Sequence, residues 1–177
     1  LRLRALAAAM LVAGFAPPLL ANDAEVVSLV GKGEARDPGA GDWRPAVVKQ
    51  KVKGGAFVRT GDRSTLALLM PDQTQLRLNQ NSMLQIREVG KGDGRTTVLN
   101  LNAGRSWVQS KTLPKGLVMN TPSAVAAIRG TDWEMAVDAD GTSTLTVLSG
   151  EVEFSNEQGS VTVGRDEQAR AEKGKAP

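Results

Sequence analysis

The sequence predicts an all-β fold made of many short strands, on the basis of three observations. Turn-forming residues recur about every eight to twelve positions after residue 22, and hydrophobic residues alternate with polar ones between these turns. No segment has the spacing of a long amphipathic helix. The unit of strand, Gly or Asp turn and strand recurs without a sharp consensus. This pattern is compatible with a solenoid-like stack of β-arches and with a twisted β-sandwich.

The composition bounds the size and the chemistry of the protein. The 177 residues are enough for one domain that buries about two-thirds of its unfolded surface. Cysteine, histidine and tyrosine are absent, which excludes disulfides and cysteine nucleophiles and removes the commonest general base and metal ligand. No serine lies in a nucleophile elbow, and no Gly-rich segment has the form of a phosphate loop. We therefore predict no enzymatic activity, no catalytic or metal-binding residue and no cofactor.

The first 21 residues have the order of a secretory signal peptide. Two arginines precede an apolar run from Ala5 to Ala16, a Pro17-Pro18 break follows, and Ala21 provides a small residue for cleavage. The run is short for a membrane span, so we expect cleavage after Ala21, export, and no stable membrane span in the mature chain. An uncleaved anchor is the alternative, because the apolar run could extend to Leu20.

The mature chain has almost no net charge. The signal segment carries two of the 22 basic residues and none of the 19 acidic ones, so its removal lowers the net charge from +3 to +1. The remaining basic residues are dispersed, whereas a nucleic-acid-binding protein would have a basic patch with interleaved aromatic residues. Nucleic acid is therefore not an expected partner.

We divide the mature chain into a β domain over residues 22–164 and a charged tail or linker stub over residues 165–177, which has no hydrophobic alternation. In the first half of the domain, a strand with Val26, Val27, Leu29 and Val30 ends at Gly31 and Gly33, and inward-facing positions follow at Leu66, Leu68, Met70, Leu76, Leu78, Leu84 and Ile86. Turns are expected at Thr60-Gly61 and at Pro71-Asp72-Gln73. Trp43, in a Gly/Pro-rich loop, is expected to fold back and plug an edge of the core.

The second half of the domain continues the same alternation. Residues 90–95 form a predicted hairpin or loop, Ala103-Gly104 a turn that ends one strand, and Asn156 to Gly159 a last hairpin turn. The alternating positions of the predicted strands are Thr97, Leu99, Leu101, Leu145, Val147, Val152, Phe154, Val161 and Val163, with Trp107 on a separate strand after the turn. The DADG sequence from Asp138 to Gly141 lacks the further ligands of a calcium loop and is interpreted as a hairpin turn.

The stretch from Asn120 to Val137 is the best-defined part of the sequence. Pro122 fixes a turn, and the small apolar run that follows suits a strand between other backbones. Gly130 indicates a positive φ or a close approach of two backbones. After it, Trp133 and the alternate residues up to Val137 share one face of a strand. We interpret Arg129 and Thr131 as structural, with Arg129 donating to carbonyls across a tight bend.

Four segments carry a resemblance to a known family: VRTGDRSTLALLMPDQTQLRLNQNSMLQI, LNLNAGRSWVQS, TPSAVAAIRGTDWEM and TLTVLSGEVEF. In this order they resemble the FecR family, which is named after the ferric citrate regulator of iron uptake in Gram-negative bacteria. The resemblance covers roughly residues 25–171. The family-motif positions, expected to be mainly structural, are Thr60, Gly61, Asp72, Gly104, Thr121, Pro122, Arg129, Gly130, Thr131 and Gly150. Gln73 departs from the Gly that usually follows the Asp.

The resemblance implies a periplasmic or secreted module of a Gram-negative cell envelope that binds another envelope protein or a receptor in signalling or as a scaffold. FecR proteins place a cytoplasmic anti-sigma segment and a membrane helix ahead of this domain, whereas here a signal peptide is expected instead, so we do not expect the sigma-factor role. The alternative is a domain that binds an envelope glycan or peptidoglycan. Exposure of Trp43 or Trp107 beside Arg and Asn side chains would favour that alternative.

Overall fold

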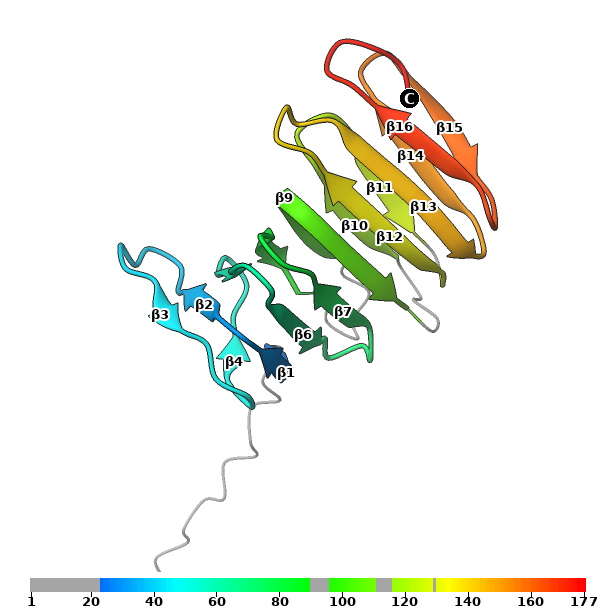
Figure 1. The fold of residues 1–177 in the computed structure, drawn as a ribbon. Helices are drawn as coiled ribbons and strands as arrows, with labels where there is room; N and C mark the ends of the chain where they lie inside the picture. The colour runs from blue at the N-terminus through cyan, green and yellow to red at the C-terminus, as the bar shows by residue number, and fades with distance from the viewer. Residues whose placement is uncertain (1–22, 90–95, 111–115, 129) are drawn as a thin grey trace, which may run out of the picture.

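The computed structural model describes residues 23–89, 96–110, 116–128 and 130–177. These residues form sixteen strands and no helix, so the all-β prediction is confirmed. No helix in the described ranges is long and apolar enough to cross a membrane. The strands form two layers that face each other along the molecule (Figure 1).

Sheet A is the first layer and contains eight strands. In spatial order these are β4 (Lys51–Val52), β1 (Ala24–Val30), β6 (Thr65–Leu69), β7 (Gln75–Leu78), the second half of β9 (Thr97–Gln109), β12 (Asp132–Val137), β13 (Ser143–Ser149) and β16 (Gln168–Ala171). All neighbouring strands in this sheet are antiparallel.

Sheet B is the second layer and shares β9 with the first. In spatial order it contains β3 (Arg44–Pro45), β2 (Gly33–Arg36), β5 (Phe57–Thr60), β8 (Met83–Glu88), the first half of β9, β10 (Leu117–Asn120), β11 (Val125–Ile128), β14 (Val152–Asn156) and β15 (Gly159–Val163). Only β9 and β10 are parallel among these described pairs. Because β9 belongs to both layers, the whole is one open sheet of sixteen strands folded into a sandwich.

The core lies between the two sheets and follows the predicted alternation. The sequence of β12 shows this most clearly, because Trp133 and Met135 are 0% exposed while Glu134 between them is only half-buried. One continuous hydrophobic cluster contains the inward residues of both sheets, from Ala24 at one end to Ala171 at the other. The predicted inward positions Leu66, Leu68, Met70, Leu76, Leu78, Leu84, Ile86, Leu99, Leu101, Leu145, Val147, Val152 and Phe154 all belong to it.

The predicted turn at Ala103-Gly104 is wrong. Residues 97–109 form one continuous strand that bends at Gly104, where φ is +83°, and passes there from sheet B into sheet A. The pairing register with β8 shifts beside the bend, because Met83 pairs with Ala103 while Leu84 pairs with Leu101. A Gly in a strand is therefore compatible with a change of sheet as well as with a turn.

Two further predictions differ from the structure at the ends of the domain. Gly33 does not follow the end of a strand but begins β2. The charged segment from residue 165, expected to be frayed, contains β16, which pairs with β13 and buries Ala171 completely. Only alternate positions of this short edge strand face the core, so it lacks the hydrophobic run by which a strand is found in a sequence.

Candidate functional site

Three of the predicted motif residues contact turns at one end of the strands, where the chain passes between the sheets. The Thr60 hydroxyl accepts a hydrogen bond from the Ser82 amide (3.1 Å) and donates to the Asn79 carbonyl, and the Gly61 amide donates to the Lys32 carbonyl (2.9 Å). A Cβ on Gly104 would lie 2.3 Å from the Ser82 hydroxyl oxygen. Thr60, Gly61 and Gly104 thus lie where the chain passes between sheets, in contact with backbone.

Asp72 closes the hairpin between β6 and β7. Its carboxylate accepts a hydrogen bond from the Thr74 amide (2.9 Å), and the Gln73 amide donates to the Met70 carbonyl (3.0 Å). Gln73 has a φ of +67°, a conformation that Gly adopts at lower cost. The residue that departs from the family pattern therefore takes a glycine-like conformation.

Gly130, Thr131 and Gly150 lie close together at the opposite ends of the strands. Both glycines have a positive φ, +64° and +78°. Thr131 is 2% exposed, its carbonyl accepts the Ser110 amide (3.1 Å), and a Cβ on Gly150 would lie 2.5 Å from the Thr131 methyl group. Arg129, predicted to donate to carbonyls across this bend, lies outside the described residues.

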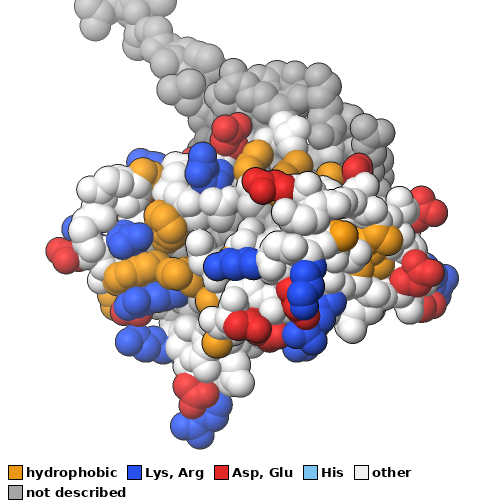
Figure 2. Space-filling view, turned by 90° about the horizontal axis from the view of Figure 1, so that it is seen from above, with side chains coloured by type: hydrophobic (Ala, Val, Ile, Leu, Met, Phe, Trp, Pro, Cys, Tyr) orange, Lys and Arg blue, Asp and Glu red, His pale blue; other side chains and the backbone are white. Residues whose placement is uncertain are grey.

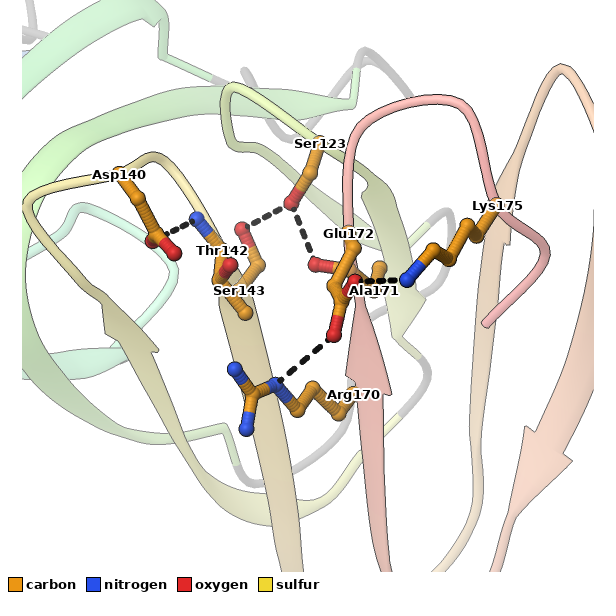
Figure 3. Close-up of polar contacts among 8 residues, drawn as sticks. All are labelled: Ser123, Asp140, Thr142, Ser143, Arg170, Ala171, Glu172 and Lys175. Carbon is orange, nitrogen blue, oxygen red and sulfur yellow. Dashed lines mark hydrogen bonds and ion pairs between the residues drawn. The ribbon is translucent and has the colours of Figure 1, made fainter.

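Thr121 belongs to a polar network with the C-terminal segment, and Pro122 follows it in the same turn. The Thr121 hydroxyl donates to the Ala124 carbonyl (2.9 Å) and accepts from Ser143 (2.7 Å). The Ser123 hydroxyl donates to the Ala171 carbonyl (2.9 Å) and lies 2.7 Å from the Ser143 hydroxyl oxygen (Figure 3). This network ties β16 to the turn after β10, beside a groove of about 690 Å³ that Pro122, Asn156 and Lys173 help to line.

Three carboxylates have lowered pKa values. The Arg59 guanidinium lowers the pKa of Glu34, the hydrogen bond from the Thr142 amide lowers that of Asp140, and the hydrogen bond from Lys175 lowers that of Glu172 (Figure 3). All three are surface groups, and the first cause of each lowered pKa is a hydrogen bond to the carboxylate. The hydrogen bonds of Glu34 link β2 to β5, those of Asp140 stabilise the Asp138–Gly141 turn, and those of Glu172 stabilise the C-terminal segment.

We expect the protein to lose stability on acidification. A carboxylate whose pKa is lower in the folded than in the unfolded chain stabilises the fold above its unfolded pKa and loses this contribution as the pH falls through the folded value. The melting temperature should therefore decrease between about pH 5 and about pH 3. The triple variant Glu34→Gln, Asp140→Asn, Glu172→Gln should show a shallower pH dependence in thermal melts. Equal slopes for the two proteins would contradict this assignment.

Two arginines and two aromatic rings gather on the outer face of sheet B. Guanidinium carbons of Arg36 and Arg59 lie 4.8 and 4.2 Å from the ring centroid of Trp43, and Arg36 also lies 4.5 Å from that of Phe57. The two rings meet edge to face at 6.5 Å. Arg59 donates to Glu34 (2.8 Å). We call Arg36, Trp43, Phe57 and Arg59 the arginine–aromatic surface.

Trp43 is therefore not the predicted plug of the core edge, because its half-buried ring lies on the outer face of the sheet, against arginine side chains. Trp107, on the outer face of sheet A, has the same environment on a smaller scale, with Arg77 5.6 Å from its ring centroid. The sequence-based prediction did not include the arginine–aromatic surface, because hydrophobic alternation identifies inward positions only. The available signal was the set of Arg and Phe residues at the outward positions of β2 and β5.

Among the described residues, no group of three or more acidic side chains could hold a metal ion. Seen from the C-terminal end of the stack, basic and acidic side chains are interspersed and no large area has a single sign (Figure 2). The arginine–aromatic surface presents two half-buried rings and two half-buried guanidinium groups on the outer face of sheet B.

The comparisons with known proteins identify the family. A model of the FecR protein family matches residues 56–153, more than half of the chain. The chain belongs to the FecR family. Two crystal structures, each of a "putative anti-sigma factor" from Parabacteroides distasonis, have TM-scores of 0.60 and 0.59 at 14% identity. Each match covers 68% of this chain and 57% or 56% of the other, so the FecR chain spans less than two-thirds of these neighbours' length and shares their fold. No curated protein matches it.

The FecR match runs from just before β5 into β14. It includes every family-motif position, from Thr60 to Gly150, and leaves out β1 to β4 and the last two strands. The arginine–aromatic surface lies across its boundary, because Phe57 and Arg59 are inside and Arg36 and Trp43 are outside. Arg36 and Trp43 therefore lie outside the part of the chain that the family model matches.

Proposed function

We propose that this FecR-family protein is a non-enzymatic interaction module of a signalling or scaffolding system in the cell envelope, and that it binds another envelope protein. The arginine–aromatic surface is the observation that carries the proposal. Trp and Arg are enriched among the few residues that supply most of the energy of a protein interface. The family and the regulatory description of the structural neighbours support a signalling role.

Binding should depend on Trp43. We expect immobilised protein to recover one defined envelope partner from a periplasmic extract, and Trp43→Ala to lose it because the ring also holds both guanidinium groups in place. Trp107→Ala is the matched control, since it removes the same ring from the other sheet. Both variants should melt close to the parent protein. Recovery that is lost equally in the two variants would contradict the assignment of the surface.

The proposed location is the periplasm or the outside of the cell, after export. The support is the order of charged, apolar and small residues over positions 1–21. Mass spectrometry of the protein isolated from the periplasmic fraction should find an N-terminus directly after Ala21. An N-terminus at Leu1 in that fraction would rule out cleavage, and recovery only from membranes would favour the uncleaved anchor.

A second candidate function is glycan binding. The specific observation in its favour is that Trp43 and Trp107 are both half-exposed beside arginine side chains. An aromatic face can pack against the apolar face of a sugar ring while polar neighbours bind the hydroxyl groups. Glycan binding, unlike protein binding, would require polar side chains beside the rings that can form hydrogen bonds with sugar hydroxyl groups.

A further inference from the structure

The outer face of sheet B carries one row of residues that crosses five strands in register. Arg36 pairs with Phe57, Phe57 with Gln85, Gln85 with Asn100, and Asn100 with Asn120. Neighbouring strands are about 4.8 Å apart, so the row is roughly 19 Å long. One end of the row is the arginine–aromatic surface and the other end consists of three carboxamides.

The three carboxamides form a hydrogen-bonded ladder, which we call the amide ladder. Asn120 donates to Asn100 (2.9 Å) and Asn100 donates to Gln85 (3.2 Å). Each carboxamide has two N–H groups and two acceptor positions, so the ladder leaves N–H and C=O groups available on an outer face where all three residues are half-exposed. The mutual bonds fix the orientation of the amides before any ligand arrives, which lowers the entropic cost of binding.

The positive charge at the arginine–aromatic end of the row favours a negatively charged ligand. Glu34 lies within ion-pair distance of both Arg59 (2.8 Å) and Lys32 (3.7 Å). Arg36 contacts two rings, and among the described residues no carboxylate lies within ion-pair distance of it. An anionic group on a ligand would therefore meet a guanidinium that forms no ion pair with a carboxylate of the described residues.

We propose that this row binds an acidic linear polysaccharide, one whose sugar rings carry carboxylates, with its chain lying across β2, β5, β8, β9 and β10. The spacing between neighbouring strands is close to the length of one sugar residue in an extended polysaccharide. Successive sugar rings can therefore contact successive side chains of the row. A carboxylate pairs with Arg36, sugar rings pack against the half-exposed surface that Trp43 and Phe57 form together with the guanidinium groups stacked on them, and hydroxyl groups bind the amide ladder. This inference rests on the second candidate function.

Other polymers fit the row less well. A peptide strand that extends a sheet needs free backbone groups at a strand edge, whereas this row lies on a face whose backbone groups are paired within the sheet. A nucleic acid needs several basic groups along its phosphates, and here the basic residues are at one end.

Titration with a homogeneous oligogalacturonate hexamer, followed by calorimetry on the full mature chain, tests the proposal. We expect saturable binding that weakens with added salt, and weakens at least about tenfold in Arg36→Gln and in Asn100→Asp, because each loses a charge-assisted or hydrogen-bonded contact. Asn100→Asp also places a negative charge opposite the ligand. Trp107→Ala, on the other sheet, should bind like the parent protein. A neutral hexamer of glucose should bind at least about tenfold more weakly.

Three outcomes would overturn the proposal: no binding of oligogalacturonate, unchanged affinity in both Arg36→Gln and Asn100→Asp while their melting temperatures are preserved, or equal affinity for a polyglutamate peptide of the same charge. The last outcome would indicate an acidic protein partner instead. Asn100→Asp separates this test from that of the protein-binding function, because it leaves Trp43 intact. If the parent protein and Asn100→Asp both recover the protein partner but the parent protein does not bind the hexamer, only the polysaccharide inference fails.

Discussion

Gly104→Ala is expected to destabilise the protein by about 2 to 5 kcal/mol in denaturant unfolding. The residue has a φ of +83°, where an L side chain is strained by about 1 to 2 kcal/mol. The new Cβ would also lie 2.5 Å from the Ser82 Cα and 2.7 Å from the Asn81 carbonyl oxygen. These are backbone atoms, so the clash can be relieved only if the turn before β8 moves away from β9.

Gly174→Ala provides the control, because Gly174 has a similar φ of +76° but nothing within 4 Å of the position of a Cβ. Its cost should be about 1 kcal/mol, which measures the conformational strain alone. The difference between the two variants then gives the cost of close packing at the bend of β9. Equal costs would mean that Ser82 and its turn adjust freely, and would refute the close-packed crossing.

Trp133→Ala should destabilise the protein by about 3 to 5 kcal/mol, because it leaves a large cavity between the sheets. Trp133 is the largest fully buried side chain among the described residues and lies on β12, between β9 and β13. The same change at Trp107, whose ring packs on the outer face, should cost much less. Chemical denaturation of both variants gives the comparison, and similar values would contradict the placement of the core.

Trp133→Phe sharpens this prediction. The indole N–H of Trp133 is buried and has no hydrogen-bond partner among the described residues. The smaller ring loses packing but also removes an unsatisfied donor, so the net cost should be about 1 kcal/mol or less. A cost as large as that of Trp133→Ala would show that the N–H group is satisfied in solution.

The sequence allowed the faces of the strands to be predicted but not the sheet to which each strand belongs. Period-2 alternation identifies the buried side of β12 and β13, because successive side chains of a strand point to opposite faces. Whether a turn such as Gly150 makes a hairpin or crosses to the other sheet depends on contacts with distant segments, here with Thr131. The same limit explains why the sequence around Gly104 predicts a turn where the strand in fact bends.

The candidate site was harder to predict than the core for a related reason. Arg36, Phe57, Gln85 and Asn100 are far apart in the sequence and become one row only when the registers of β2, β5, β8 and β9 are known. Outward residues have no hydrophobic signature of their own. The position of Trp43 could not be derived either, since a loop residue has no alternation to indicate which face it covers.

The double membership of β9 has a consequence for the order of folding. Among the described strands, those before β9 pair only with one another and with β9, and so do those after it. In a chain that grows from its N-terminus, the edges of β7 and β8 that β9 covers in the complete fold therefore stay unpaired until residues 97–109 are added. Truncated chains that end before this segment, or directly after it so that β10 and β12 are missing, should aggregate through unpaired edges more than the full chain does.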